Sequence, residues 1–126
     1  MRDNWNRALH PPLEAAFQQG LTAKRPDVRF HKARLSGLWT SSPLTEFLEK
    51  NGLKTLLFTG VNSDQCVLAS LQDACNQGRD CVLLKDGCGT NSPDLARETV
   101  EYNCEQSWGF VSSCEELAIG VKNMKQ

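Results

Sequence analysis

Cys66 is the residue whose type and position best suit covalent chemistry. The apolar residues 53–60 predict a buried strand that ends in a glycine turn, and the helix predicted after it contains Cys66 in its first turn. Unpaired backbone N–H groups and the positive end of the helix dipole favour a thiolate there. The pattern therefore predicts a nucleophile with N–H donors beside it that can stabilise an oxyanion.

The elements that must position Cys66 alternate between strands and helices. Strands are predicted over residues 27–32, 53–60, 81–85 and 109–112. Helices are predicted over 12–19, from Ser42-Pro43 to 51, over 64–77 with Ser63 as cap and Gly78 as terminator, from Pro93 to 103, and over 113–118. This order indicates a parallel sheet with right-handed crossovers.

Ligand sites of parallel α/β sheets lie at the carboxyl ends of the strands. Lys32, Cys66 and Asp86 all fall at predicted strand ends, so we expect the site at that edge. Because side chains alternate along a strand, His31 is expected to face away from Lys32.

Length and charge limit the classes of partner. The 126 residues suffice for one domain with a core, and 14 basic side chains nearly balance 15 acidic ones. Without a basic cluster we expect no nucleic-acid partner. No apolar run approaches the ~18 residues of a membrane helix, and no export signal is visible, so we expect a protein without membrane association.

Cysteine spacing favours free thiols over disulfides. The six cysteines include no Cys-x-x-Cys pair, and most fall in apolar surroundings on predicted helices and strands. His10 and His31 give no zinc spacing, so no metal is expected. Free thiols are typical of the reducing cytosol, which predicts a cytoplasmic protein.

Several segments together resemble the isochorismatase-like cysteine hydrolases, which include nicotinamidases and ureidoacrylate amidohydrolases. They are Lys32-Ala-Arg-Leu-Ser-Gly-Leu-Trp39, the helix 44–52, Gly60-Val-Asn-Ser-Asp-Gln-Cys-Val67, Asp73-Ala74, Gly78 and Asp86. The resemblance covers residues 28–118, with 1–27 as an N-terminal segment of the same single domain. It implies a three-layer α/β/α, Rossmann-like fold with a mostly parallel sheet.

The resemblance also implies roles for individual residues. Cys66 matches the nucleophile, and Lys32 matches the lysine that stabilises the thiolate. A cis peptide bond is expected at Val61–Asn62, with the backbone N–H groups of Asn62 and Cys66 as oxyanion donors. Trp39 matches a substrate-pocket aromatic, and its Ser-Gly-Leu-Trp context favours small amide or ureide substrates. No cofactor or metal is implied.

One departure leaves the function open. In the family a catalytic aspartate follows an N-terminal strand, and nothing of that kind precedes residue 27, so the chain resembles a member without its first ~90–100 residues. That would expose the edge of the strand at 53–60, and we expect a homo-oligomer.

Three interpretations follow. The chain is a hydrolase acting through Cys66, with Asp64 or Asp86 as candidate substitute bases. Alternatively, it is a truncated, non-catalytic module that binds a ligand or another protein, with Cys66 a structural thiol. In the third, a neighbouring copy supplies the acidic group and oligomerisation completes the site.

Overall fold

The computed structural model describes residues 8–124 and divides into two compact units, Met1–Phe30 and His31–Gln126. Within the first unit, helix α1 (Pro11–Gly20) confirms the helix predicted over 12–19. The Arg29 guanidinium lies 4.4 Å from the centre of the Phe17 ring and donates to the Glu14 carboxylate at 2.8 Å.

The strand predicted over residues 27–32 is wrong. These residues are irregular, and all but Phe30 are exposed. The segment has no apolar run to bury against a sheet, which leaves its few apolar side chains unable to fix a strand. Lys32 therefore does not end a strand.

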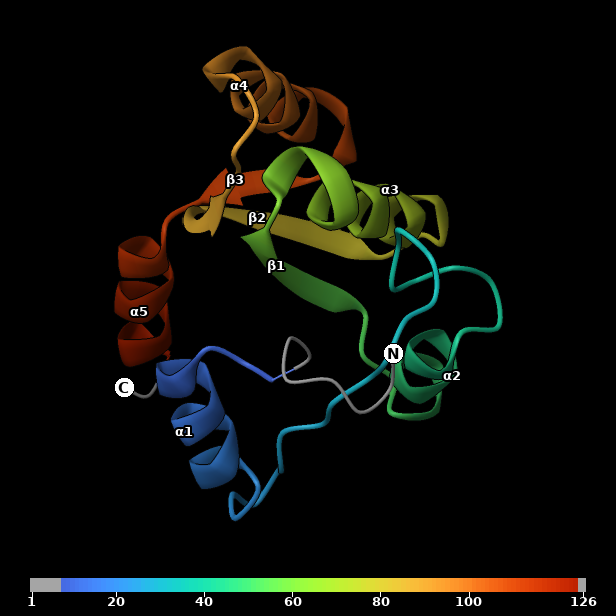
Figure 1. Ribbon diagram of the computed structural model, residues 1–126, viewed down its shortest axis with the longest axis vertical. Coiled ribbons are helices and arrows are strands. Elements are labelled where there is room, and N and C mark those ends of the chain that lie inside the picture. Colours follow the sequence, from blue (N-terminus) through green and yellow to red (C-terminus); the bar gives the residue numbers. More distant parts are fainter. Residues whose placement is uncertain (1–7, 125–126) are drawn as a thin grey trace. The chain divides into compact units, whose positions relative to one another are not determined.

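The second unit contains a parallel sheet in the order β1-β2-β3 (Figure 1), formed by β1 (Thr55–Val61), β2 (Asp80–Gly89) and β3 (Phe110–Ser112). Phe58 pairs with Leu83, and Val82 pairs with Phe110. β2 continues past the predicted end at residue 85, so Asp86 lies inside a strand and not at its end.

The helices of this unit are α2 (Pro43–Lys50), the π-helical turn η2 (Ser63–Val67), α3 (Leu68–Asn76), α4 (Asp94–Asn103), the π-helical turn η3 (Cys104–Trp108) and α5 (Cys114–Asn123). Ser42 caps α2 as predicted, accepting the Thr45 N–H at 3.0 Å.

Two predicted helix starts need correction. Asn62, not Ser63, precedes η2, and the Ser63 side chain caps nothing because the residue lies inside the turn. Pro93 precedes α4 and is not its first residue. Gly78 follows α3 with φ +73°, the left-handed conformation expected of a terminating glycine.

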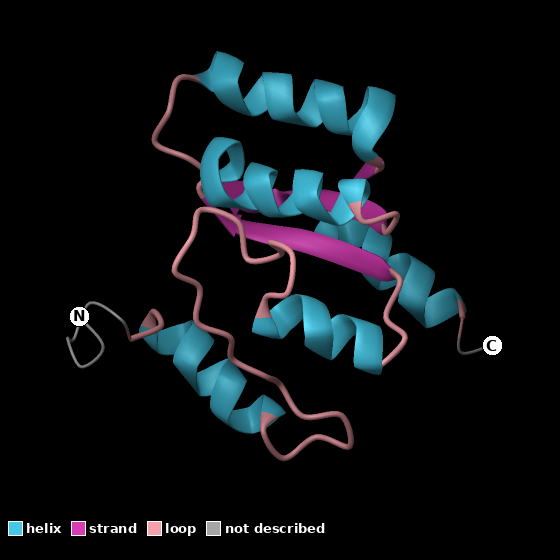
Figure 2. Ribbon diagram, turned by 90° about the vertical axis from the view of Figure 1, so that its right-hand side faces the viewer, coloured by secondary structure: helices cyan, strands magenta, loops and turns pink. Residues whose placement is uncertain are grey.

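The core lies between the sheet and the helices that connect its strands. Figures 1 and 2 show α3 and α4 on one face of the sheet and α5 on the other. Phe58 and Leu83 pack with Leu71 and Ala74 of α3, and the predicted apolar face of that helix is confirmed. The predicted α/β class, with a parallel sheet and helices on both faces, is therefore confirmed.

The opposite face of the sheet is partly open to solvent. Leu57 is 51% exposed and Phe110 is 69% exposed, whereas Leu84 is buried. β1 is an edge strand, paired with β2 on one side. An apolar edge of this kind favours pairing with another strand.

Candidate active site

The thiol of Cys66 lies at the carboxyl end of β1. The strand ends at Val61, the Val61–Asn62 peptide bond is cis, and η2 follows at once. Cys66 is half-buried, and its Sγ donates to the Val61 carbonyl oxygen at 3.3 Å. This hydrogen bond holds the Cys66 side chain against the end of β1.

Lys32 lies in the loop before α2. Its Nζ donates to the carbonyl oxygens of Arg34 at 2.9 Å and Leu35 at 2.8 Å. An ammonium group has three N–H donors, and the two loop carbonyls accept two of them.

A short hydrogen-bond chain connects the loop of Lys32 to the helix turn after Cys66. The Gly37 N–H donates to Ser70 Oγ at 2.9 Å, and that hydroxyl donates to the Cys66 carbonyl oxygen at 2.7 Å. A side chain on Gly37 would lie 3.9 Å from Lys32 Cδ and 3.8 Å from Ser70 Oγ. The structure therefore brings the lysine loop beside the Cys66 helix, while Lys32 Nζ itself bonds to loop carbonyls.

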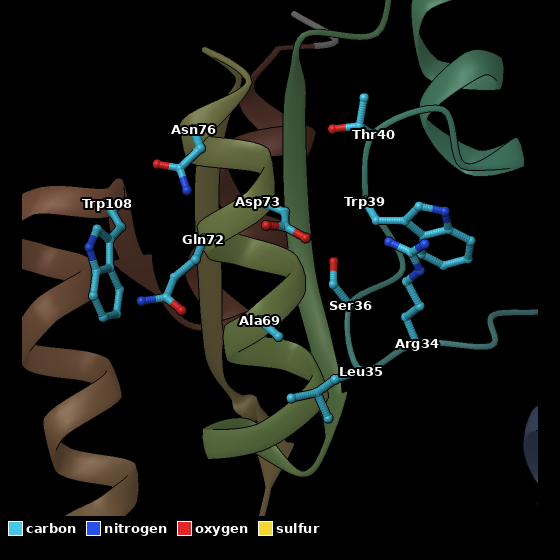
Figure 3. Close-up of a pocket in the computed structure, with 10 residues that line it drawn as sticks. All are labelled: Arg34, Leu35, Ser36, Trp39, Thr40, Ala69, Gln72, Asp73, Asn76 and Trp108. Atoms are coloured by element: carbon cyan, nitrogen blue, oxygen red, sulfur yellow. The ribbon is translucent and has the colours of Figure 1, made fainter.

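Trp39 lines a pocket of about 640 Å³ on the outer face of α3. Figure 3 shows Trp39 and Arg34 on one side of this helix and Trp108 on the other. The Arg34 guanidinium lies 5.6 Å from the Trp39 ring centre. The pocket is lined by Arg34, Leu35, Ser36, Trp39, Thr40, Ala69, Gln72, Asp73, Asn76 and Trp108, and so includes neither Cys66 nor Lys32.

The sequence reasoning missed most of this pocket. Ala69, Gln72, Asp73 and Asn76 recur at helical spacing, so the period of α3 could have shown that they share a face. Trp108 could not have been placed there, because only the tertiary path of η3 brings it to α3.

Asp64 and Asp86, the candidate substitute bases, are both engaged elsewhere. Asp64 accepts hydrogen bonds from Thr90 and Ser92. These bonds, the one from Thr90 more than the one from Ser92, lower the pKa of its carboxyl to about 2. Asp86 accepts the Cys114 backbone N–H at 2.8 Å, which lowers the pKa of its carboxyl. Neither group is suited to take a proton near neutral pH.

Ser63 stands out for its unsatisfied hydroxyl. Its side chain is 2% exposed, and its Oγ has no hydrogen-bond partner within the described part of the chain. Buried hydroxyls are normally paired, so this position carries a cost in stability beside the nucleophile.

All six cysteines are free. Burial raises the pKa of the Cys81 thiol to about 11 and also raises the pKa of the Cys88 and Cys104 thiols. A raised pKa keeps these thiols protonated at neutral pH, and so makes them poor nucleophiles. In residues 8–124, no cluster of three or more metal-ligating side chains is present, and no helix is long and apolar enough to cross a membrane.

Comparison with known proteins gives consistent matches. A family model, the isochorismatase domain, matches residues 2–116. Ureidoacrylate amidohydrolase RutB of Caulobacter vibrioides is 32% identical over 97 residues, which are 77% of this chain and 43% of that protein. RutB of Pseudomonas syringae pv. syringae is 31% identical over 77% of this chain and 39% of its own length. The chain thus spans about two fifths of these relatives.

Solved structures match the fold. The nicotinamidase PncA of Bacillus subtilis aligns with a TM-score of 0.78 at 22% identity, over 88% of this chain and 59% of its own. The nicotinamidase SaPncA of Staphylococcus aureus aligns with a TM-score of 0.80 at 19% identity, over 90% of this chain and 69% of its own.

Proposed function

Because the chain belongs to the isochorismatase family of hydrolases, we propose that it cleaves a carbon–nitrogen bond of a small amide or ureide through a thioester at Cys66. The observation that carries this proposal is the position of the Cys66 thiol, half-buried in the turn that follows β1. The ureide class is supported by the similarity to the ureidoacrylate amidohydrolases.

The proposed reaction has two steps. The Cys66 thiol gives its proton to a base, and the sulfur bonds to the carbonyl carbon while the π pair moves to oxygen. Collapse of this adduct breaks the carbon–nitrogen bond, and the nitrogen takes the proton and leaves as ammonia or an amine. Water then attacks the thioester, releasing the acid and restoring the thiol.

The charge that develops in these steps needs nearby donors. We assign the oxyanion to the backbone N–H groups of Asn62 and Cys66, and the stabilisation of the thiolate to Lys32. Trp39 is assigned to substrate binding, although the pocket that it lines does not include Cys66.

The reaction needs a proton acceptor for the Cys66 thiol. Asp64 and Asp86 accept hydrogen bonds from other groups, so neither fits the role. We propose that the chain forms homo-oligomers through the open edge of β1, and that an acidic side chain of a neighbouring copy serves as the base. The free thiols support a reducing, cytoplasmic location.

A second candidate function is a non-catalytic module that binds a ligand or another protein. Two observations favour it: the 640 Å³ pocket does not include Cys66, and the Cys66 Sγ hydrogen-bonds to a carbonyl and not to a carboxylate.

Hydrolysis assays separate the two candidates. The purified chain is tested for ammonia release from a panel that includes ureidoacrylate, other ureides and nicotinamide, beside the variants Cys66→Ala and Cys114→Ala. Cys114 is an exposed thiol outside the proposed site and provides the matched control. Loss of activity in Cys66→Ala alone supports the enzyme. Activity that survives Cys66→Ala, or none in any sample, contradicts it.

A further inference from the structure

The loop between β2 and α4, residues 90–93, is joined to the nucleophile turn through one carboxylate. Asp64 lies in η2, two residues before Cys66. Its Oδ1 accepts from Thr90 Oγ1, and its Oδ2 accepts from Ser92 Oγ at 2.7 Å. Both oxygens of one side chain are therefore used to hold a segment that is remote in sequence.

The loop is also shaped by these contacts. The Ser92 N–H donates to Thr90 Oγ1 at 3.1 Å, so that hydroxyl both donates and accepts. Just before the loop, Gly89 of β2 pairs with Val61 of β1. The turn that carries Cys66 is thus fixed to the β2–α4 segment at two points, one through the backbone and one through Asp64.

The chemistry of the contact suits a permanent tether. Hydrogen bonds to an ionised carboxylate are stronger than those between neutral groups. Thr90 and Ser92 are neutral donors, so the carboxylate keeps its full charge beside the first N–H groups of η2, where a negative charge is favourable. The lowered pKa of Asp64 means that the tether is intact at neutral pH.

We propose that Asp64 is a positioning residue that ties the loop of Thr90 and Ser92 to η2 and so fixes the orientation of the Cys66 turn. The tether itself follows from the hydrogen bonds, whereas its role in catalysis rests on the proposed function of Cys66. Without it, only the backbone pairing of Gly89 with Val61 joins the two segments, and the thiol and its neighbouring N–H groups are held less firmly in one geometry.

The test compares the two sides of the tether. Asp64→Ala removes the acceptor. Thr90→Val with Ser92→Ala removes both donors of the loop and leaves η2 untouched, including the Gln65 side chain that donates to Asp64 at 3.2 Å. The second variant keeps the proposal testable if Asp64→Ala does not fold. Thr90→Ser keeps the hydroxyl that Thr90→Val removes, and should leave the tether intact. Thr99→Val is the matched control, because the Thr99 hydroxyl donates to the Leu95 carbonyl oxygen within α4 and not to the tether.

Two measurements are made on each variant: hydrogen exchange of the amides in residues 62–66 and 90–92, and the kcat and KM of hydrolysis. We expect exchange in both segments to rise about fivefold or more on removing either side, with no further rise when both are removed, because the two changes break the same interaction. We expect kcat to fall with KM little changed, and Thr90→Ser and Thr99→Val to behave like the wild type.

The outcomes separate the two proposals. Coupled exchange in a protein that hydrolyses nothing supports the tether and contradicts only the proposed function. Additive or unchanged exchange overturns the tether, and an unchanged kcat in an active protein overturns its positioning role.

Discussion

At the scale of single residues, Cys66 could be placed from sequence because the strand and the turn that carry it are specified by nearby residues. An apolar strand, a glycine turn and a helix start lie within fifteen residues, so the chain has little freedom in where it puts the thiol. The strand is not fully buried as predicted, because β1 lies at the edge of the sheet and only its Phe58 is buried. The path of Lys32 could not be predicted. Its loop is fixed by distant contacts, such as the Gly37–Ser70 hydrogen bond, and not by a strand of its own.

Lys32 offers the first prediction. Lys32→Met removes the charge and the hydrogen bonds to the Arg34 and Leu35 carbonyls, so we expect kcat/KM to fall about 100-fold, as when an electrostatic donor is lost from an active site. Lys50→Met, at the exposed end of α2, is the control. Equal kinetics of Lys32→Met and wild type would remove Lys32 from the site.

Asp64 gives a pH dependence whose sign is fixed by its environment. Because the pKa of its carboxyl is lowered to about 2 from an ordinary value of 3.8, ionised Asp64 stabilises the fold above about pH 4, and this contribution is lost as the pH falls toward 2. We expect Asp64→Asn to lower the free energy of unfolding at pH 7 and to differ little from wild type near pH 2. Urea titrations of both proteins at several pH values between 2 and 7 measure the difference in their free energies of unfolding. A difference that does not change with pH would contradict the assignment.

At the scale of elements, the apolar strand β1, the helix α2 with its Ser42 cap and the apolar face of α3 were predictable because short patterns specify them. The π-helical turns and the length of β2 were not, since they depend on pairing with neighbours: β2 continues through Gly89 only because Val61 of β1 lies alongside it. The strand predicted at 27–32 failed because alternation in a polar segment does not provide a surface to bury.

The junction of η3 and β3 yields a matched pair of glycine substitutions. A Cβ at Gly109 would lie 2.1 Å from the Cys81 carbonyl oxygen, whereas one at Gly120, inside α5, meets nothing within 4 Å. We expect Gly109→Ala to lower the free energy of unfolding by about 1–3 kcal/mol. Gly120→Ala should raise it by about 0.5–1 kcal/mol, because alanine favours the helix. Chemical denaturation measures both, and a neutral Gly109→Ala would contradict the close packing.

At the scale of the whole molecule, the sheet presents an open edge and a partly exposed apolar face. The fold class was predictable from the alternation of strands and helices. What covers β1 in solution was not, because no pattern within the chain identifies its neighbour.

Light scattering tests the proposed association. We expect a mass above the 14.0 kDa of one chain, and we expect Leu57→Lys to shift it toward that value by placing a charge on the exposed face beside the edge. Leu95→Lys, on an exposed position of α4, should leave the mass unchanged. A wild-type protein that is monomeric at all concentrations contradicts the association.

The central claim is that Cys66 is an activated nucleophile, and its alkylation rate tests this most directly. Iodoacetamide labelling at neutral pH, followed for each cysteine by peptide mass spectrometry, compares Cys66 with exposed Cys114 and with free glutathione in the same tube. The account predicts that Cys66 reacts roughly tenfold faster than glutathione, because only a stabilised thiolate overcomes its partial burial. Cys114 should react more slowly than glutathione, because its hydrogen bond to Asp86 raises the pKa of its thiol. A Cys66 that reacts no faster than glutathione would contradict the claim.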